Sequence, residues 1–148
     1  MGGVIVEMIG TPLVPGTAVG VAATANEALS FWGGFNPESG EVIDRRHPLS
    51  GRVVTGQVLV LPHGRGSCSA SGVFLEAVRN RTAPAAVIVS RIDPIIGLGA
   101  ILGEELYETT IPVVLVSGED RARIVDGDLI EISPAGRVTV RHGHQDHQ

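Results

Sequence analysis

The chain has 148 residues, enough for one well-formed hydrophobic core and too few for two ordinary domains. A composition of 43% hydrophobic and 18% charged residues, with 20 glycines and 9 prolines, is typical of a globular protein with many tight turns and excludes a disordered chain. All 11 basic residues are arginines scattered from Arg45 to Arg141, so we expect no nucleic-acid partner. The net charge of -5 indicates nothing about the substrate.

Cysteine usage and the hydropathy pattern favour a cytoplasmic protein. The single cysteine, Cys68, cannot form an internal disulfide, and the amino terminus lacks the basic start, apolar run and cleavage site of a secretory leader. No segment approaches the roughly 20 consecutive apolar residues that span a membrane. We therefore expect a cytoplasmic location and no membrane partner.

Short runs rich in valine and isoleucine predict a series of strands, and two longer segments predict helices. One helix is expected from Ser69 to Asn80, after a glycine-serine turn, and another from Asp93 to Glu108. The predicted strands cover residues 3–9, 17–23, 57–61, 85–90, 111–117, 128–133 and 137–141. This order predicts a mixed α/β fold that forms one compact domain over residues 1–141.

The last third of the chain is predicted to form a hairpin. Val125-Asp126-Gly127-Asp128 precedes one apolar run and Pro134-Ala135-Gly136 precedes another, and both have the composition of turns that join antiparallel strands. The polar tail, residues 142–148, carries three histidines that could bind a metal, but we interpret it as a frayed, disordered end.

The segment with the most chemical content runs from Leu59 to Gly72, where an apolar strand leads into a glycine-serine turn and then a helix. The start of a helix directs backbone N–H groups and the positive end of the helix dipole at one spot, where an anion is held. The segment is therefore a candidate binding site for a carboxylate or phosphate.

Ser67 lies in this turn and is the candidate catalytic residue. A serine hydroxyl is a weaker acid than the tyrosine phenol, whose reference pKa is about 10, so a serine base needs strong stabilisation of its alkoxide. The amides of Gly66, Cys68 and Ser69 and the charge of Arg65 would supply that stabilisation. The spacing fits a simple helix N-cap by Ser67 or Ser69 equally well.

Two neighbours of Ser67 have ordinary structural interpretations. Cys68 cannot hold an iron–sulfur cluster by itself, because such a cluster is bound by several cysteine thiolates. His63 could be a general base at neutral pH, but we interpret it as a polar residue at the end of a strand.

A second unusual stretch, Ala28 to Gly40, gathers two of the three phenylalanines and the only tryptophan beside the paired glycines Gly33 and Gly34. A loop with this much aromatic surface is expected to pack against something. One interpretation is core packing beneath the loop. The other is a lip that closes over a substrate or docks on a partner, with Ser30, Gly33 and Gly34 as substrate-binding candidates.

Together these two stretches resemble the small subunit of the aconitase X family. The resemblance covers nearly the whole chain and is carried by Leu29-Ser30-Phe31-Trp32-Gly33-Gly34, Glu41-Val42-Ile43-Asp44, His47-Pro48, Gly51, Gly64-Arg65-Gly66-Ser67, Ala83-Pro84-Ala85 and Asp126-Gly127-Asp128. It implies a swivelling β/β/α domain of the aconitase type that works with a large subunit.

The resemblance also implies roles for individual residues. The proton acceptor of the family falls on Ser67, and the groups that bind the substrate carboxylate or activate the serine fall on Arg65, Gly66, Cys68 and Ser69. Family members often carry a run similar to Ser-Ser-Ser-Gly after the arginine and glycine. Here Cys68 and Ala70 interrupt that run, which affects the secondary serines and not Ser67.

The implied reaction is elimination of water from a hydroxy acid, in which Ser67 removes a proton α to a carboxylate while a metal centre helps the hydroxyl leave. The chain is expected to bind no cofactor alone and to be inactive without the large subunit, which would carry an iron or iron–sulfur centre. Family members dehydrate cis-3-hydroxy-L-proline or mevalonate 5-phosphate. The absence of lysine suggests a high-GC bacterial genome and favours cis-3-hydroxy-L-proline.

Two other classes of function are open. A mobile phosphohistidine domain has a similar β/β/α architecture and an Asp-Gly-Asp hairpin, but it needs a histidine in the turn where this chain has Ser67, Cys68 and Ser69. A non-catalytic binding module would use the aromatic loop to dock a partner, and its glycine-serine turn would only cap a helix.

Overall fold

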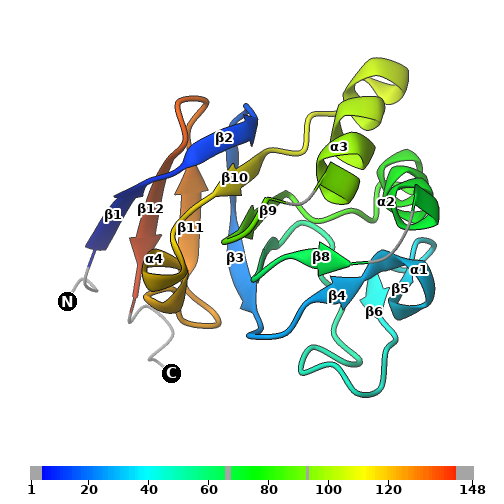
Figure 1. Cartoon of the computed structure of the whole chain (residues 1–148), viewed down its shortest axis with the longest axis horizontal. Helices are drawn as coiled ribbons and strands as arrows, with labels where there is room; N and C mark the ends of the chain where they lie inside the picture. Colours follow the sequence, from blue (N-terminus) through cyan, green and yellow to red (C-terminus); the bar gives the residue numbers. More distant parts are fainter. Residues whose placement is uncertain (1–4, 66–67, 93, 143–148) are drawn as a thin grey trace.

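Figure 1 shows the computed structural model, which describes residues 5–65, 68–92 and 94–142; at 65, 68–70, 94 and 95 it describes the backbone only. Across the described residues, the main sheet has eight strands in the order β1-β12-β11-β3-β7-β9-β10-β2. These strands are β1 (Ile5–Ile9), β2 (Thr11–Val14), β3 (Ala18–Thr24), β7 (Val58–Leu61), β9 (Ala86–Val89), β10 (Val113–Leu115), β11 (Leu129–Ile132) and β12 (Arg137–Arg141).

Strands β3, β7, β9 and β10 run parallel and form the half of the sheet that carries the long helices. The chain crosses from β7 to β9 through α2 (Cys68–Asn80) and from β9 to β10 through α3 (Pro94–Tyr107). Leu59 and Leu61 of β7 belong to the core shared with these helices, whereas Val58 and Val60 belong to a second core on the opposite side. Because both faces are covered, β7 and β9 are apolar throughout and do not alternate.

Helices α2 and α3 pack closely because α3 presents glycines to α2. A Cβ on Gly99 would come within 3.0 Å of the Phe74 ring, and a Cβ on Gly103 would come within 3.0 Å of Val78. The contacts advance along both helices in the same direction, so the two helices run parallel and begin at the same end.

The antiparallel half of the sheet curls round so that the whole sheet forms a nearly closed barrel. β1 and β2 stand at opposite ends of the strand order, yet only Gly10 separates them in the chain. The Gly10 N–H donates to the Gly136 carbonyl (2.8 Å), and a Cβ on Gly10 would lie 2.8 Å from the Leu115 carbonyl oxygen and also collide with Val114. Glycine is therefore required where the two ends of the sheet meet.

Short elements join the barrel to the loops near α2. β4 (Leu29–Ser30) pairs in parallel with β8 (Gly64–Arg65), β5 (Phe35–Asn36) pairs antiparallel with β6 (Glu41–Val42), and α1 (Phe31–Gly34) lies between β4 and β5. Ser117 caps the start of α4 (Gly118–Ala122), where its hydroxyl accepts the Asp120 N–H (3.0 Å).

The mixed α/β prediction is confirmed, and each predicted strand and helix has a counterpart within a few residues of its expected bounds. The final hairpin is confirmed as β11 and β12. One expectation was wrong: residues 125–128 form a turn, but it connects α4 to β11, so it does not join two antiparallel strands. Helix α4 and this turn together connect β10 to β11, which are not neighbours in the sheet. Residues 143–148 of the tail lie outside the described residues.

Candidate active site

The structure brings together the two stretches that the sequence singled out. Leu29 pairs with Gly64 and Ser30 pairs with Arg65 in the small parallel sheet β4–β8. α1 follows β4 directly, and α2 begins at Cys68, soon after β8 ends. Figure 1 shows β4, β8, α1 and the adjoining end of α2 gathered at one side of the molecule. We call this junction the β8–α2 corner.

Several predicted site residues in this corner are not described in full. Gly66 and Ser67 lie outside the described residues, as do the side chains of Arg65, Cys68 and Ser69. The backbone shows that Cys68 and Ser69 open α2, whose first turn contains no acidic residue. The positive end of the helix is therefore not neutralised by its own side chains, which is the condition for holding an anion. The roles of these five residues stay predictions.

The loop opposite β8 has an unusual backbone. Within α1, Trp32 is extended (φ -86°, ψ 115°) and Gly33 is left-handed (φ +83°), a conformation that favours glycine. The Ser30 hydroxyl donates to the Trp32 carbonyl (2.9 Å), and the Gly34 carbonyl accepts the Ile43 N–H (2.9 Å). The turn at 30–34 is thus fixed by its own hydrogen bonds, which place Ser30, Gly33 and Gly34 beside the corner.

The aromatic residues of this stretch divide between the two interpretations given above. Phe31 and Phe35 are buried, and Phe31 makes edge contacts with Phe35 and with Phe74 of α2 (ring centroids 5.1 and 5.2 Å apart). These two side chains form core packing beneath the loop. Trp32 is 64% exposed, so its ring has no comparable place in the core.

Two histidines near the corner have local hydrogen-bonding roles. The Nδ1 atom of His63 contacts the Gly64 carbonyl, an arrangement that suits a polar residue at the end of β7. His47 is buried: its Nδ1 accepts the Leu49 N–H (3.1 Å), and its Nε2 lies 3.1 Å from the Glu27 carbonyl, so Nε2 carries the hydrogen. His47 therefore holds the loop after β6 against the segment before β4.

Arg121 connects the carboxyl ends of two parallel strands, and sequence reasoning missed it. Its guanidinium donates to the Ser90 hydroxyl (3.0 Å), the Ala25 carbonyl (3.4 Å) and the Asn26 side-chain oxygen (3.3 Å). These acceptors follow β9 and β3. No local pattern could have revealed the contact, because the residues that take part lie far apart in the chain.

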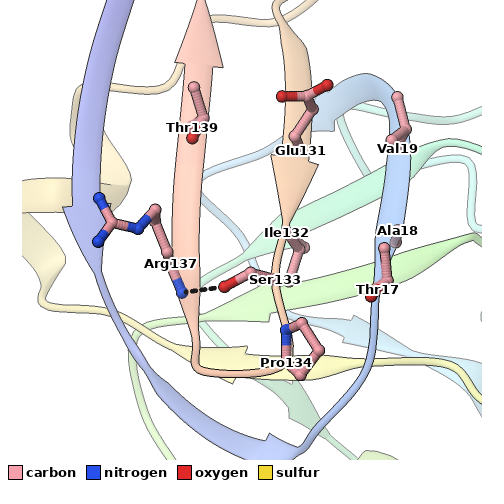
Figure 2. A pocket seen from close by; sticks show the side chains of 9 residues that line it. All are labelled: Thr17, Ala18, Val19, Glu131, Ile132, Ser133, Pro134, Arg137 and Thr139. Carbon is pink, nitrogen blue, oxygen red and sulfur yellow. Dashed lines mark hydrogen bonds between the residues drawn. The ribbon is translucent and has the colours of Figure 1, made fainter.

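A shallow hollow of about 350 Å³ lies on the outer side of the antiparallel strands, as Figure 2 shows. In this hollow the backbone N–H of Arg137 donates to the Ser133 hydroxyl (3.2 Å), and the Arg137 guanidinium pairs with Glu7 (3.2 Å). The lining residues are Thr17, Ala18, Val19, Glu131, Ile132, Ser133, Pro134, Arg137 and Thr139. The hollow contains none of the predicted site residues, so we keep the β8–α2 corner as the candidate site.

The described part of the chain contains no group of three or more histidine, cysteine, aspartate or glutamate residues placed to hold a metal ion. Among the same residues, no helix is long and apolar enough to cross a membrane.

Comparison with known proteins assigns the family. The family model described as the aconitase X swivel domain matches residues 7–140. The chain belongs to the aconitase X swivel-domain family. It is 45% identical over 124 residues to a cis-3-hydroxy-L-proline dehydratase of Pseudomonas aeruginosa, a match that covers 79% of this chain and 21% of that protein. The swivel domain described here thus spans about a fifth of the length of that relative.

Other aconitase X relatives match over most of their own length. A phosphomevalonate dehydratase small subunit of Methanopyrus kandleri is 39% identical over 117 residues, which cover 78% of this chain and 82% of that subunit. The holo-form crystal structure of Thermococcus kodakaraensis aconitase X superposes with a TM-score of 0.81 at 32% identity and covers 91% of this chain and 98% of that one. The predicted swivel fold is therefore confirmed.

Proposed function

We propose that this chain is the swivel component of an aconitase X type hydro-lyase and that it acts with a large subunit. The observation that carries the proposal is the pairing of Ser30 with Arg65, which joins the two family motifs at the start of α2. Relatives in the family are named as dehydratases, both as small subunits and as longer chains.

The proposed role of Ser67 is to remove the proton α to the substrate carboxylate. The amides at the start of α2 and the charge of Arg65 would stabilise the serine alkoxide and orient the carboxylate. The described residues do not fit a metal site, and one cysteine is too few for an iron–sulfur cluster. We therefore place the iron or iron–sulfur centre in the large subunit and assign it no step on this chain.

The substrate we propose is cis-3-hydroxy-L-proline, which would yield a pyrroline carboxylate. The 45% identity to the Pseudomonas aeruginosa dehydratase supports this choice over mevalonate 5-phosphate. Mevalonate 5-phosphate is the second candidate, because the small subunit from Methanopyrus kandleri matches this chain over 82% of its length.

The first prediction concerns Ser67→Ala in a complex with the aconitase X large subunit encoded in the same genome. Loss of the base is expected to lower the rate of cis-3-hydroxy-L-proline dehydration by about 10²–10⁴-fold, while the complex still forms. Product formation is followed by mass spectrometry, and complex formation by size-exclusion chromatography.

Ser69→Ala is the matched control, since it removes a neighbouring hydroxyl and should retain far more activity. Equal activity of wild type and Ser67→Ala would exclude Ser67 as the base and leave a non-catalytic binding role. An intact, metal-loaded wild-type complex that dehydrates only mevalonate 5-phosphate would overturn the substrate assignment.

A further inference from the structure

We propose that the large component of the dehydratase docks on the outer surface made by α1 and the first turns of α2 and α3. We call this surface the α1–α3 face; its defining residues are Trp32, Gly33, Gly72, Gly97, Leu98 and Ile101. The proposal rests on the proposed function, from which it takes the existence of a large component. It adds the location of the contact and the residues that make it.

The first observation is the composition of α3. Residues 94–103 of this helix include no charged side chain. One side is buried through Ile96, Gly99 and Ala100, yet Leu98 and Ile101 on the opposite side are 41% and 47% exposed. A helix that is apolar on all sides is normally covered on all sides. Within the part of the chain that the structure describes, nothing covers the outer side of α3 at Leu98 and Ile101.

The second observation is the pair of outward-facing glycines. A Cβ on Gly72 of α2 or Gly97 of α3 would meet nothing within 4 Å. Gly99 and Gly103, in contrast, are needed for the contact between the two helices. Glycine is less favourable than alanine inside a helix, so a glycine without an internal role indicates close approach by another surface.

The third observation is the distribution of charge along the two parallel helices. The outer side of α2 becomes charged at Glu76 and Arg79, which form an ion pair, and that of α3 becomes charged at Glu104 and Glu105. The Arg79 guanidinium lowers the pKa of the Glu76 carboxyl, so this pair stays ionised in solvent. The uncharged turns of both helices therefore lie at the same end, beside the β8–α2 corner.

Trp32 extends this uncharged surface onto α1. It is 64% exposed. It lies two residues after Ser30, which pairs with Arg65. The open space around Gly33, whose φ is +83°, leaves room for a contacting surface next to the indole. Tryptophan is enriched among the residues that contribute most to binding at protein interfaces.

The occupant that fits is the large component of the same enzyme. The Pseudomonas aeruginosa relative is matched over 21% of its length, so most of that polypeptide lies outside the swivel domain. The α1–α3 face borders the candidate site, so a body seated there would lie next to β8 and the first turn of α2. A surface of glycine, leucine, isoleucine and tryptophan suits an apolar protein partner.

The test measures binding of variants to the co-expressed large subunit of the aconitase X type from the same genome, by isothermal titration calorimetry. Trp32→Ser and Leu98→Asp are each expected to weaken the complex by about 10-fold or more. Ile9→Ser and Val21→Asp are matched controls, because these residues are 67% and 40% exposed and lie in β1 and β3, outside the helices of the α1–α3 face. The controls should bind within about 2-fold of wild type.

Gly72 and Gly97 provide a second test, in which stability and binding are expected to change in opposite directions. Gly72→Ala and Gly97→Ala should each raise the melting temperature of the isolated chain by about 2–4 °C and yet weaken the complex. Gly118→Ala is the control: its Cβ also meets nothing within 4 Å, but it lies in α4, which is at the left of Figure 1, away from α1, α2 and α3. It should leave binding unchanged.

The outcomes separate this inference from the proposed function. If wild type binds and all variants of the α1–α3 face bind equally well, the docking face is wrong while the dehydratase assignment stands. If wild type forms no complex with the large subunit, both proposals fail. If the face variants abolish only self-association of this chain, the occupant is a second copy and the inference is overturned.

Discussion

At the scale of single residues, the loops near the candidate site are shaped by side chains that accept a hydrogen bond from the backbone N–H two residues later in the chain. Asn36 accepts the Glu38 N–H (2.9 Å), and Asp44 accepts the Arg46 N–H (3.0 Å). His47 does the same toward Leu49, and its second nitrogen reaches another loop. Such bonds allow irregular backbone to persist without a sheet or helix partner.

We predict that His47→Ala destabilises the chain by about 1–3 kcal/mol, because the buried Leu49 N–H and the part-buried Glu27 carbonyl lose their partner. His47→Asn should recover part of the loss, since an asparagine side chain can accept the Leu49 N–H in the same kind of turn. Urea denaturation measures both variants. Equal stability of His47→Ala and wild type would mean that water replaces both bonds.

At the scale of elements, the Asp126-Gly127-Asp128 turn has a structural explanation. Asp126 accepts the Thr24 N–H (3.0 Å) and pairs with Arg52 (2.9 Å). Asp128 is fully buried; one of its oxygens accepts the Val125 N–H (2.8 Å) and lies 2.6 Å from Nδ1 of His142. Gly127 has a φ of +92°, and its N–H donates to Ala22 (3.0 Å). The turn fastens the end of β3 to the start of β11.

This arrangement predicts unequal effects of its two aspartates on stability. Asp128→Ala should cost about 2–4 kcal/mol, because it removes a fully buried carboxylate that accepts the Val125 N–H and contacts His142. Asp126→Ala should cost about 1 kcal/mol or less, since its pair with Arg52 is partly exposed. Thermal unfolding of the two variants gives the comparison, and a larger loss at Asp126 would contradict it.

The long elements were predictable from the sequence and the corner itself was not. The apolar runs of β7 and β9 and the spacing in α2 are strong local signals. β4 and β8 have two residues each and exist only because they pair with one another, and α1 contains backbone that is not helical. The family motifs pointed to the candidate site residues. That the two motifs lie side by side could be seen only in the folded structure. In the sequence, Leu98 and Ile101 look like ordinary residues of an apolar helix, and only the structure shows that they are exposed.

At the scale of the whole molecule, closure of the barrel depends on Gly10. Replacing it with alanine would drive a methyl group into Val114 and the Leu115 carbonyl. The strands on either side of Gly10, β1 and β2, are held in place by their neighbours β12 and β10, so they cannot easily move apart. We predict that Gly10→Ala costs more than about 2 kcal/mol, by overpacking at a site that cannot relax. Chemical denaturation tests this, with Gly118→Ala as a control that has open space. A cost below that of the control would show that the seam can open.

The pairing of the first and last strands has a consequence for gene organisation. β1 and β12 are antiparallel neighbours, with Ile5 opposite Arg141, and Figure 1 places them on the other side of the molecule from α1, α2 and α3. A tether joined beyond either strand would leave the β8–α2 corner unobstructed. The same unit can therefore serve as a separately translated subunit or be fused in frame within a longer polypeptide, as its relatives of both lengths illustrate.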